Sequence, residues 1–196
     1  MKKGFHNQYF ILRHGQTIYQ TKKKKITYPW PDNPPVKLTK KGIRDIQKGA
    51  EKLKNKGINL IFSSDIFRTK QTAGIVAKTL GSKVYFDKRL RDLNLGVFHG
   101  GKKEKFYRLF PNPQKVFFSG PKKGESWNDV KKRTLNFLKE TDKKYKNKKI
   151  LIISHGDPLW LLEGLIKGLT NQEMLEEKFV KRNYIKTAEL RELIST

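Results

Sequence analysis

Short apolar runs that alternate with amphipathic stretches are the feature that constrains this chain most. The runs lie at 8–13, 58–64, 83–86 and 149–154, and each has the length of one buried strand. Helical periodicity is predicted at 40–56, 66–80, 126–146, 158–167 and 171–180. The last stretch, 187–193, could be an edge strand or a helix, and we favour the strand. Such alternation predicts a three-layer α/β/α fold with a mostly parallel central sheet.

Local signals at the helix ends support these boundaries. Gly57 and Gly81 are expected to end the first two helices by adopting a left-handed backbone conformation. Ser126 followed by Asp129 is a capping box that opens the helix at 126–146. Pro158 is acceptable in the first turn of the next helix, where its missing N–H is not needed.

The length of 196 residues suits a single domain spanning 1–196, and no linker divides it. Two loops rich in Pro and Gly, 29–36 and 111–124, are candidate rims of a site. We expect the segment at about 98–124 to form a small lid.

The net charge of +26 arises mostly from lysine, since 35 of the 44 basic residues are Lys. Two interpretations are open: a solvated lysine-rich surface, or a surface that binds polyanions. Apart from a run at 22–25, the lysines are spread along the whole chain, whereas nucleic-acid modules concentrate their charge. We therefore expect no specific nucleic-acid partner.

Several classes of protein are disfavoured by what the sequence lacks. Without cysteine there is no disulfide or thiolate metal site, and the four His residues, at 6, 14, 99 and 155, lack metal-ligand spacing. Residues 96–103 fit part of a P-loop but have Lys103 where Ser or Thr is required. The apolar runs are too short for a signal peptide or a membrane span, so we expect a cytoplasmic protein with no membrane partner.

Two of the predicted strands end in a His-Gly pair, at His14-Gly15 and His155-Gly156. The carboxyl ends of parallel strands meet at one sheet edge, where such folds place their chemistry. Arg13 adds a planar donor suited to phosphate or carboxylate, and Arg68 follows another strand at the same edge. Asp92, before a glycine-flanked loop, is either a turn residue or a candidate general acid.

Five motifs in order resemble the histidine phosphatase superfamily, in the branch of the cofactor-dependent phosphoglycerate mutases. They are RHGQT at 13–17, LTKKG at 38–42, SSDIFRTKQTA at 63–73, GES at 124–126 and SHG at 154–156. The resemblance implies that His14 is a nucleophile forming a phosphohistidine. It also implies that Arg13, Arg68 and His155 surround the phosphoryl oxygens, with Gln20 and Gly156 also contacting phosphate, and that neither metal nor cofactor is needed.

The chain departs from the family pattern in several places. Asp92 stands where a glutamate is usual, four residues before Gly96, so its reach as an acid is in question. Gln20 replaces an Asn, and its longer amide could still donate to phosphate. Asp157 follows the second His-Gly pair and could cap the next helix or orient His155; we favour the cap.

The function that the residues and the resemblance favour is phosphomonoester hydrolysis of a small anionic phosphorylated metabolite. A cofactor-dependent phosphoglycerate mutase is the alternative, although the compact 101–124 stretch lacks the adjacent Arg pair of such mutases. An inactive phosphate- or polyanion-binding member of the fold is the second alternative. The sequence leaves the choice between monomer and homodimer open.

Overall fold

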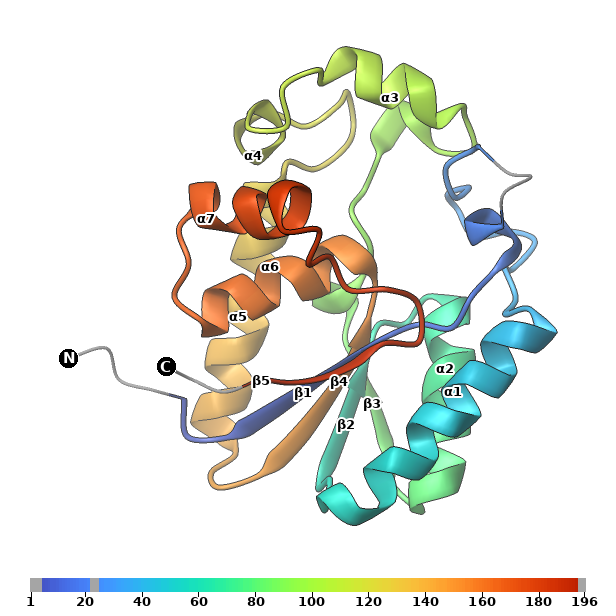
Figure 1. The fold of residues 1–196 in the computed structure, drawn as a ribbon, viewed down its shortest axis with the longest axis vertical. Coiled ribbons are helices and arrows are strands. Elements are labelled where there is room, and N and C mark those ends of the chain that lie inside the picture. The colour runs from blue at the N-terminus through green and yellow to red at the C-terminus, as the bar shows by residue number, and fades with distance from the viewer. Residues whose placement is uncertain (1–4, 22–24, 194–196) are drawn as a thin grey trace.

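The computed structural model describes residues 5–21 and 25–193, so most of the lysine run at 22–25 lies outside the described residues. A five-stranded sheet with the order β3-β2-β4-β1-β5 forms its centre (Figure 1). The strands are β1 (Gln8–Arg13), β2 (Leu60–Ser63), β3 (Val84–Phe86), β4 (Lys149–Ser154) and β5 (Leu190–Leu193). All pairings are parallel except that of β5 with β1, which confirms the mostly parallel sheet and the final edge strand.

Helices cover both faces of the sheet, because side chains along each buried strand alternate between two cores. Tyr9 and Ile11 of β1 face α5 (Trp127–Lys144) and α6 (Gly156–Ile166). Phe10 and Leu12 face α1 (Lys40–Leu53) and α2 (Phe67–Leu80) on the opposite side. The three-layer α/β/α architecture predicted from the sequence is therefore confirmed (Figure 1).

The predicted helix ends are mostly confirmed. Gly57 and Gly81 are left-handed and follow the first two helices, and Ser126 and Asp129 form the capping box of α5. The start of α6 was predicted wrongly: it begins at Gly156, so Pro158 lies within its first turn. The expected helix at 171–180 is α7 (Asn171–Leu175) followed by a wider π-helical turn, Glu176–Val180.

Two short helices, α3 (Lys103–Leu109) and α4 (Lys115–Phe118), lie in the segment at about 98–124. In Figure 1 they stand above the carboxyl ends of the central strands. Val116 and Phe117 of α4 are buried in a third apolar cluster with Trp127 and Trp160, whereas no residue of α3 is buried. The lid role of this segment stays a prediction. Among the described residues, no helix combines the length and the apolar character needed to cross a bilayer.

Candidate active site

The two His-Gly pairs lie side by side at the sheet edge, because β1 and β4 are neighbours in register. Arg13 pairs with Ser154, and the next residue, His14, donates its backbone N–H to the Ser154 carbonyl at 3.1 Å. The rings of His14 and His155 are 5.3 Å apart between centroids, and both side chains are buried. The strand pairing thus brings together the two histidines that the sequence predicted to meet.

The His14 ring is oriented by its own neighbour. Its Nδ1 lies 2.8 Å from the Gly15 carbonyl oxygen, which can only accept, so Nδ1 carries the proton. The Nε2 lone pair is therefore left free. Burial, followed by the positive charges of Arg68 and Arg13, holds the pKa of His14 well below its usual range. The ring is therefore oriented and neutral near neutral pH.

Gly15 is required by close packing rather than by a left-handed backbone conformation. Its φ is not among the positive values of the chain. A Cβ at this position would lie 2.8 Å from the carbonyl oxygen of Gly42 in α1, and a Cβ on Gly42 would lie 2.3 Å from the carbonyl of Gln16. Two glycines thus allow the backbone that follows His14 to touch α1 directly.

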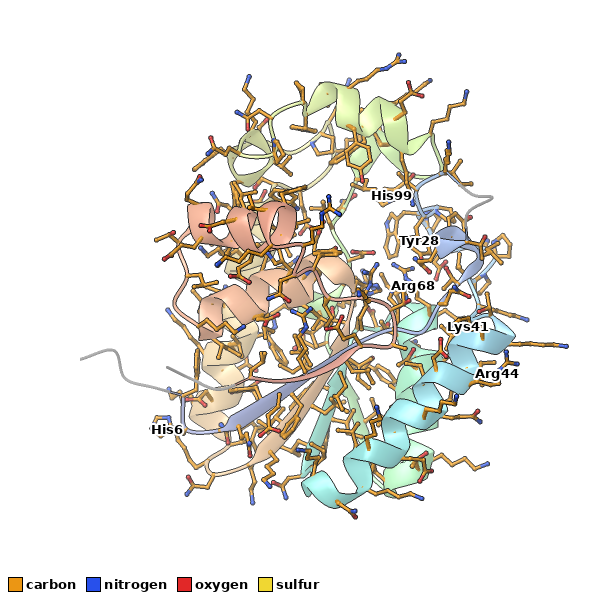
Figure 2. The ribbon with its side chains drawn as sticks, in the orientation of Figure 1. His6, Tyr28, Lys41, Arg44, Arg68 and His99 are labelled. Atoms are coloured by element: carbon orange, nitrogen blue, oxygen red, sulfur yellow. The ribbon has the colours of Figure 1, made fainter. Side chains whose placement is uncertain are left out.

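Arg68 lies in the first turn of α2, which follows β2 at the same edge. Its guanidinium stacks on the ring of Tyr28 with 3.8 Å between Cζ and the centroid, and it donates to the Asp92 carboxylate at 2.9 Å. Figure 2 shows Arg68, Tyr28 and His99 one above the other between the sheet and α3. A buried cation held by stacking on one side keeps donors available on the other.

Unpartnered donors converge on this point. Among the described residues, the buried side-chain polar atoms without a partner include Arg13 Nε, Arg68 Nε and His155 Nδ1. His155 Nε2 lies 3.0 Å from Ser64 Oγ, which accepts from the Ile66 N–H and has its own hydroxyl proton to donate. Donation from Ser64 to Nε2 places the ring proton on Nδ1.

These donors lack an acceptor, and an anion would supply one. Buried donors left without acceptors are costly, and a phosphoryl group would satisfy all of them together. Burial and the charge of Arg68 also hold the pKa of His155 well below its usual range, so this ring donates as a neutral imidazole.

Asp92 lies at the entrance to these donors, with its side chain 29% exposed. One carboxylate oxygen accepts from Arg68 and lies 3.6 Å from His155 Nδ1. The Asp92 loop is held from behind: Arg133 donates to the Asp92 carbonyl at 3.0 Å and pairs with Glu125 at 2.8 Å. The shorter carboxylate therefore lies beside Arg68 and His155, and its role as an acid stays a prediction.

Two residues singled out in the sequence make other contacts than expected. Gln20 accepts from the Thr17 backbone at 2.8 Å and donates to the Tyr28 hydroxyl, so in this structure it holds the loop behind the site. Asp157 neither caps α6, whose N-cap His155 has no side-chain cap, nor contacts His155. Its side chain is 18% exposed and accepts from Lys178 at 2.7 Å. The prediction that Asp157 caps the helix was wrong because the cap position lies two residues earlier.

Gly156 begins α6 at the floor of the site. A Cβ there would lie 2.0 Å from the hydroxyl oxygen of Tyr184, which donates to Asp157 at 2.8 Å. The Tyr184 ring in turn lies 5.5 Å from the guanidinium carbon of Arg13, which also donates to the Ile185 carbonyl. The absent side chain thus allows Tyr184 to reach the helix start and support Arg13.

Sequence reasoning missed Tyr28, Ser64, Arg133, Lys178 and Tyr184. Ser64 and Glu125 lie inside the quoted motifs, where only their neighbours were interpreted. Tyr28 lies in an irregular loop, and Lys178 and Tyr184 reach the site only through the packing of the chain after α7; no local pattern marks them.

Two cavities meet at Asp92 and Tyr28. The larger, about 470 Å³, contains Arg13 and Gly156 and extends beneath α3; we call it the apolar cavity. The smaller, about 300 Å³, contains Arg68, Lys88 and Arg91; we call it the basic cavity. Arg13 lines the apolar cavity, Arg68 lines the basic cavity, and Asp92 and Tyr28 line both. The described residues contain no group of three or more His, Cys, Asp and Glu side chains arranged to hold a metal.

Comparison with known proteins agrees with this geometry. The family model of the histidine phosphatase superfamily (branch 1) matches residues 9–187. The chain belongs to the histidine phosphatase superfamily. This family member is 30% identical over 167 residues to the Escherichia coli O1:K1 protein named "Probable phosphoglycerate mutase GpmB", covering 83% of this chain and 75% of that protein.

Solved structures share the fold of this superfamily member. The native mycobacterial glucosyl-3-phosphoglycerate phosphatase superposes with a TM-score of 0.77 at 22% identity, covering 93% of this chain and 88% of that one. The alpha-ribazole phosphatase of Shigella flexneri gives a TM-score of 0.74 at 19% identity, with coverages of 93% and 88%. The family and the fold predicted from the five motifs are confirmed.

Proposed function

We propose that this protein is a metal-independent phosphomonoesterase that acts through a phosphohistidine on a small anionic phosphorylated metabolite. The observation that carries the proposal is the neutral, oriented His14 ring next to buried, unpartnered donors of Arg13, Arg68 and His155. A nucleophile without its own charge beside donors that lack an anion is the arrangement that phosphoryl transfer requires.

The reaction has two steps. His14 Nε2 attacks the phosphorus of the ester monoanion, and the proton of that monoanion passes to the Asp92 carboxylate. The P–O bond to the alcohol breaks, and Asp92 gives this proton to the departing oxygen. Water then attacks the phosphohistidine, the P–N bond breaks, and Asp92 takes the proton from that water. Arg13, Arg68 and His155 hold the three phosphoryl oxygens throughout, so the charge that a metal would neutralise elsewhere is met by this chain's own cations.

The test is turnover of p-nitrophenyl phosphate with and without EDTA, for the wild type, His14→Ala and His6→Ala. His6 lies at the opposite end of the molecule (Figure 2) and serves as the matched control. We expect activity in EDTA for the wild type and His6→Ala, and none for His14→Ala. Activity that survives His14→Ala would refute the nucleophile, and activity abolished by EDTA would refute metal independence.

The role of Asp92 has a separate test. Asp92→Asn should slow alkyl esters more than p-nitrophenyl phosphate, because p-nitrophenolate leaves with little protonation. Equal losses on both esters would argue against the acid role and leave Asp92 as a partner of Arg68 only.

A phosphoglycerate mutase is the second candidate, favoured by the relative named for that activity. The partial exposure of Asp92 and the two open cavities favour hydrolysis, because a mutase must keep water from its phosphohistidine. Incubation with 3-phosphoglycerate and 2,3-bisphosphoglycerate distinguishes them: rapid formation of 2-phosphoglycerate with little free phosphate would overturn the phosphatase. Absence of any turnover with retained phosphate binding would support the inactive binding protein instead.

A further inference from the structure

The leaving group of the substrate must occupy one of the two cavities that meet at Asp92, and their chemistry differs. The apolar cavity is the larger and runs from Arg13 and Gly156 to the underside of α3. Its walls come from four parts of the chain and are mainly aromatic or aliphatic: Leu95, Phe106, Tyr107, Phe110, Trp127 and Phe179. Nothing in the catalytic steps above uses this surface.

The charges on the wall of the apolar cavity already neutralise one another. Lys178 and Asp157 form an ion pair at 2.7 Å, with side chains 13% and 18% exposed. Asp157 also accepts from Tyr184 and from the Trp127 indole at 3.2 Å. The Lys178 ammonium lies over the rings of Trp127 and Trp160, 4.4 and 4.2 Å from their centroids. This wall therefore presents rings and a closed ion pair. The other charged residues that line the cavity are Arg13, Asp92 and Lys103, the last from the first turn of α3.

The aromatic side chains at the roof of the apolar cavity are exposed to solvent. Tyr107 on α3 is 64% exposed, and Phe179, which lines the same cavity from the π-helical turn, is 50% exposed. No residue of α3 is buried, although Phe106 and Phe110 make ring contacts along this helix. An apolar group bound in the cavity would cover these rings and hold α3 against the domain.

The basic cavity is less suited to a leaving group. Its cations are already paired: Arg91 makes two contacts of 2.6 Å with Asp65, Arg133 pairs with Glu125, and Arg68 with Asp92. It is also the smaller of the two, and Lys88 is the remaining lysine that lines it.

We propose that the apolar cavity is the leaving-group site and that the substrates are phosphate monoesters of ring-bearing, largely uncharged alcohols. The ester's negative charge is then confined to the phosphoryl group, and the ring packs between Phe106 and the wall made by Trp127 and Tyr184. This assignment rests on the proposed phosphatase function. It makes phosphoglycerates poorer substrates, because a carboxylate on the leaving group would face mainly aromatic rings and the closed Asp157–Lys178 pair, with Lys103 as its cationic partner.

The test compares 2-phenylethyl phosphate with 3-phosphoglycerate. Both are esters of primary alcohols, so their intrinsic reactivities are similar. We expect kcat/KM at least about tenfold higher for the phenylethyl ester. Phe106→Ala should remove most of that advantage while changing 3-phosphoglycerate turnover by less than about twofold. Lys88→Ala, in the basic cavity, is the matched control and should leave the ratio unchanged.

A binding experiment distinguishes the failure of the leaving-group site from the failure of the proposed phosphatase function. Benzylphosphonate and methylphosphonate cannot be hydrolysed, and calorimetry with the wild type and Phe106→Ala measures the contribution of the ring alone. If benzylphosphonate binds more tightly than methylphosphonate, Phe106→Ala removes the difference and no ester is hydrolysed, the phosphatase is refuted and the apolar binding site is retained. Hydrolysis that prefers 3-phosphoglycerate, or a preference altered by Lys88→Ala and not by Phe106→Ala, would overturn the apolar site and keep the phosphatase. A circular-dichroism melt of Phe106→Ala checks that the variant folds.

Discussion

The buried ion pair between Asp157 and Lys178 gives a stability prediction that can be worked from the structure. Removing one partner of a buried pair costs about 3–5 kcal/mol, because the other charge is left unpaired. Lys178→Met leaves the Asp157 carboxylate with Tyr184 and Trp127 as neutral donors, so we expect the lower end, about 3 kcal/mol. Asp157→Asn leaves the ammonium among aromatic rings that still attract it, and we expect about 2 kcal/mol.

The double variant should lose only about 2 kcal/mol, since neither charge then remains unpaired. The coupling energy of the cycle is therefore about 3 kcal/mol, measured by urea unfolding at pH 7. Burial raises the pKa of Asp157. The charge of Lys178 and its hydrogen bond lower this pKa, so that it lies below its ordinary value. This contribution is thus present above the carboxyl range of the unfolded chain and lost as the pH falls through the folded pKa. A coupling under about 0.5 kcal/mol at pH 7 would show that water screens the pair and refute the reasoning.

Three further predictions follow from the same contacts. Gly42→Ala should destabilise the protein by about 2 kcal/mol, because the added methyl would lie 2.3 Å from a backbone oxygen. Gly74→Ala is the control: its methyl would have nothing within 4 Å, so it should stabilise the protein by about 0.5–1 kcal/mol in the same unfolding assay. Gly156→Ala should displace Tyr184 and lower kcat/KM at least about tenfold, with little change in far-ultraviolet circular dichroism. Nitrogen-15 spectra should show His14 neutral and protonated on Nδ1 from pH 8 to 6, since its pKa is lowered; a titration midpoint near 6.5 would contradict this.

The sequence contained enough to predict the layers and the meeting of the two histidines. The strand around Ile11 and the strand around Ile152 are continuous apolar runs, and runs of that kind are buried between helices in parallel sheets. Once both strands are in one parallel sheet, His14 and His155 must share an edge. Arg68 was predictable for the same reason, because it follows β2 by only a few residues.

The parts that escaped prediction depend on contacts between distant segments. Tyr28 covers Arg68 from an irregular loop, and Lys178 reaches Asp157 only because the π-helical turn after α7 packs against Trp127 and Trp160. Asp157 was interpreted through its neighbours in sequence, and helix capping is the commonest local use of such a residue. Its real partners lie 21 and 27 residues further along the chain, where no periodic pattern points back to it.

The position of β1 in the sheet has a consequence for when this protein can become active during its synthesis. The strand that carries His14 is made before both of its neighbours, β4 and β5, which come from residues 149–193. The residue after β1 is held by the Ser154 carbonyl on one side, and Ala188 donates back to it on the other. A ribosome-bound chain that stops before residue 149 therefore has His14 and the α1 contact of Gly15, but neither strand that flanks β1. Under the proposed function, stalled chains released at increasing lengths should gain phosphoryl-transfer activity only after β5 has emerged.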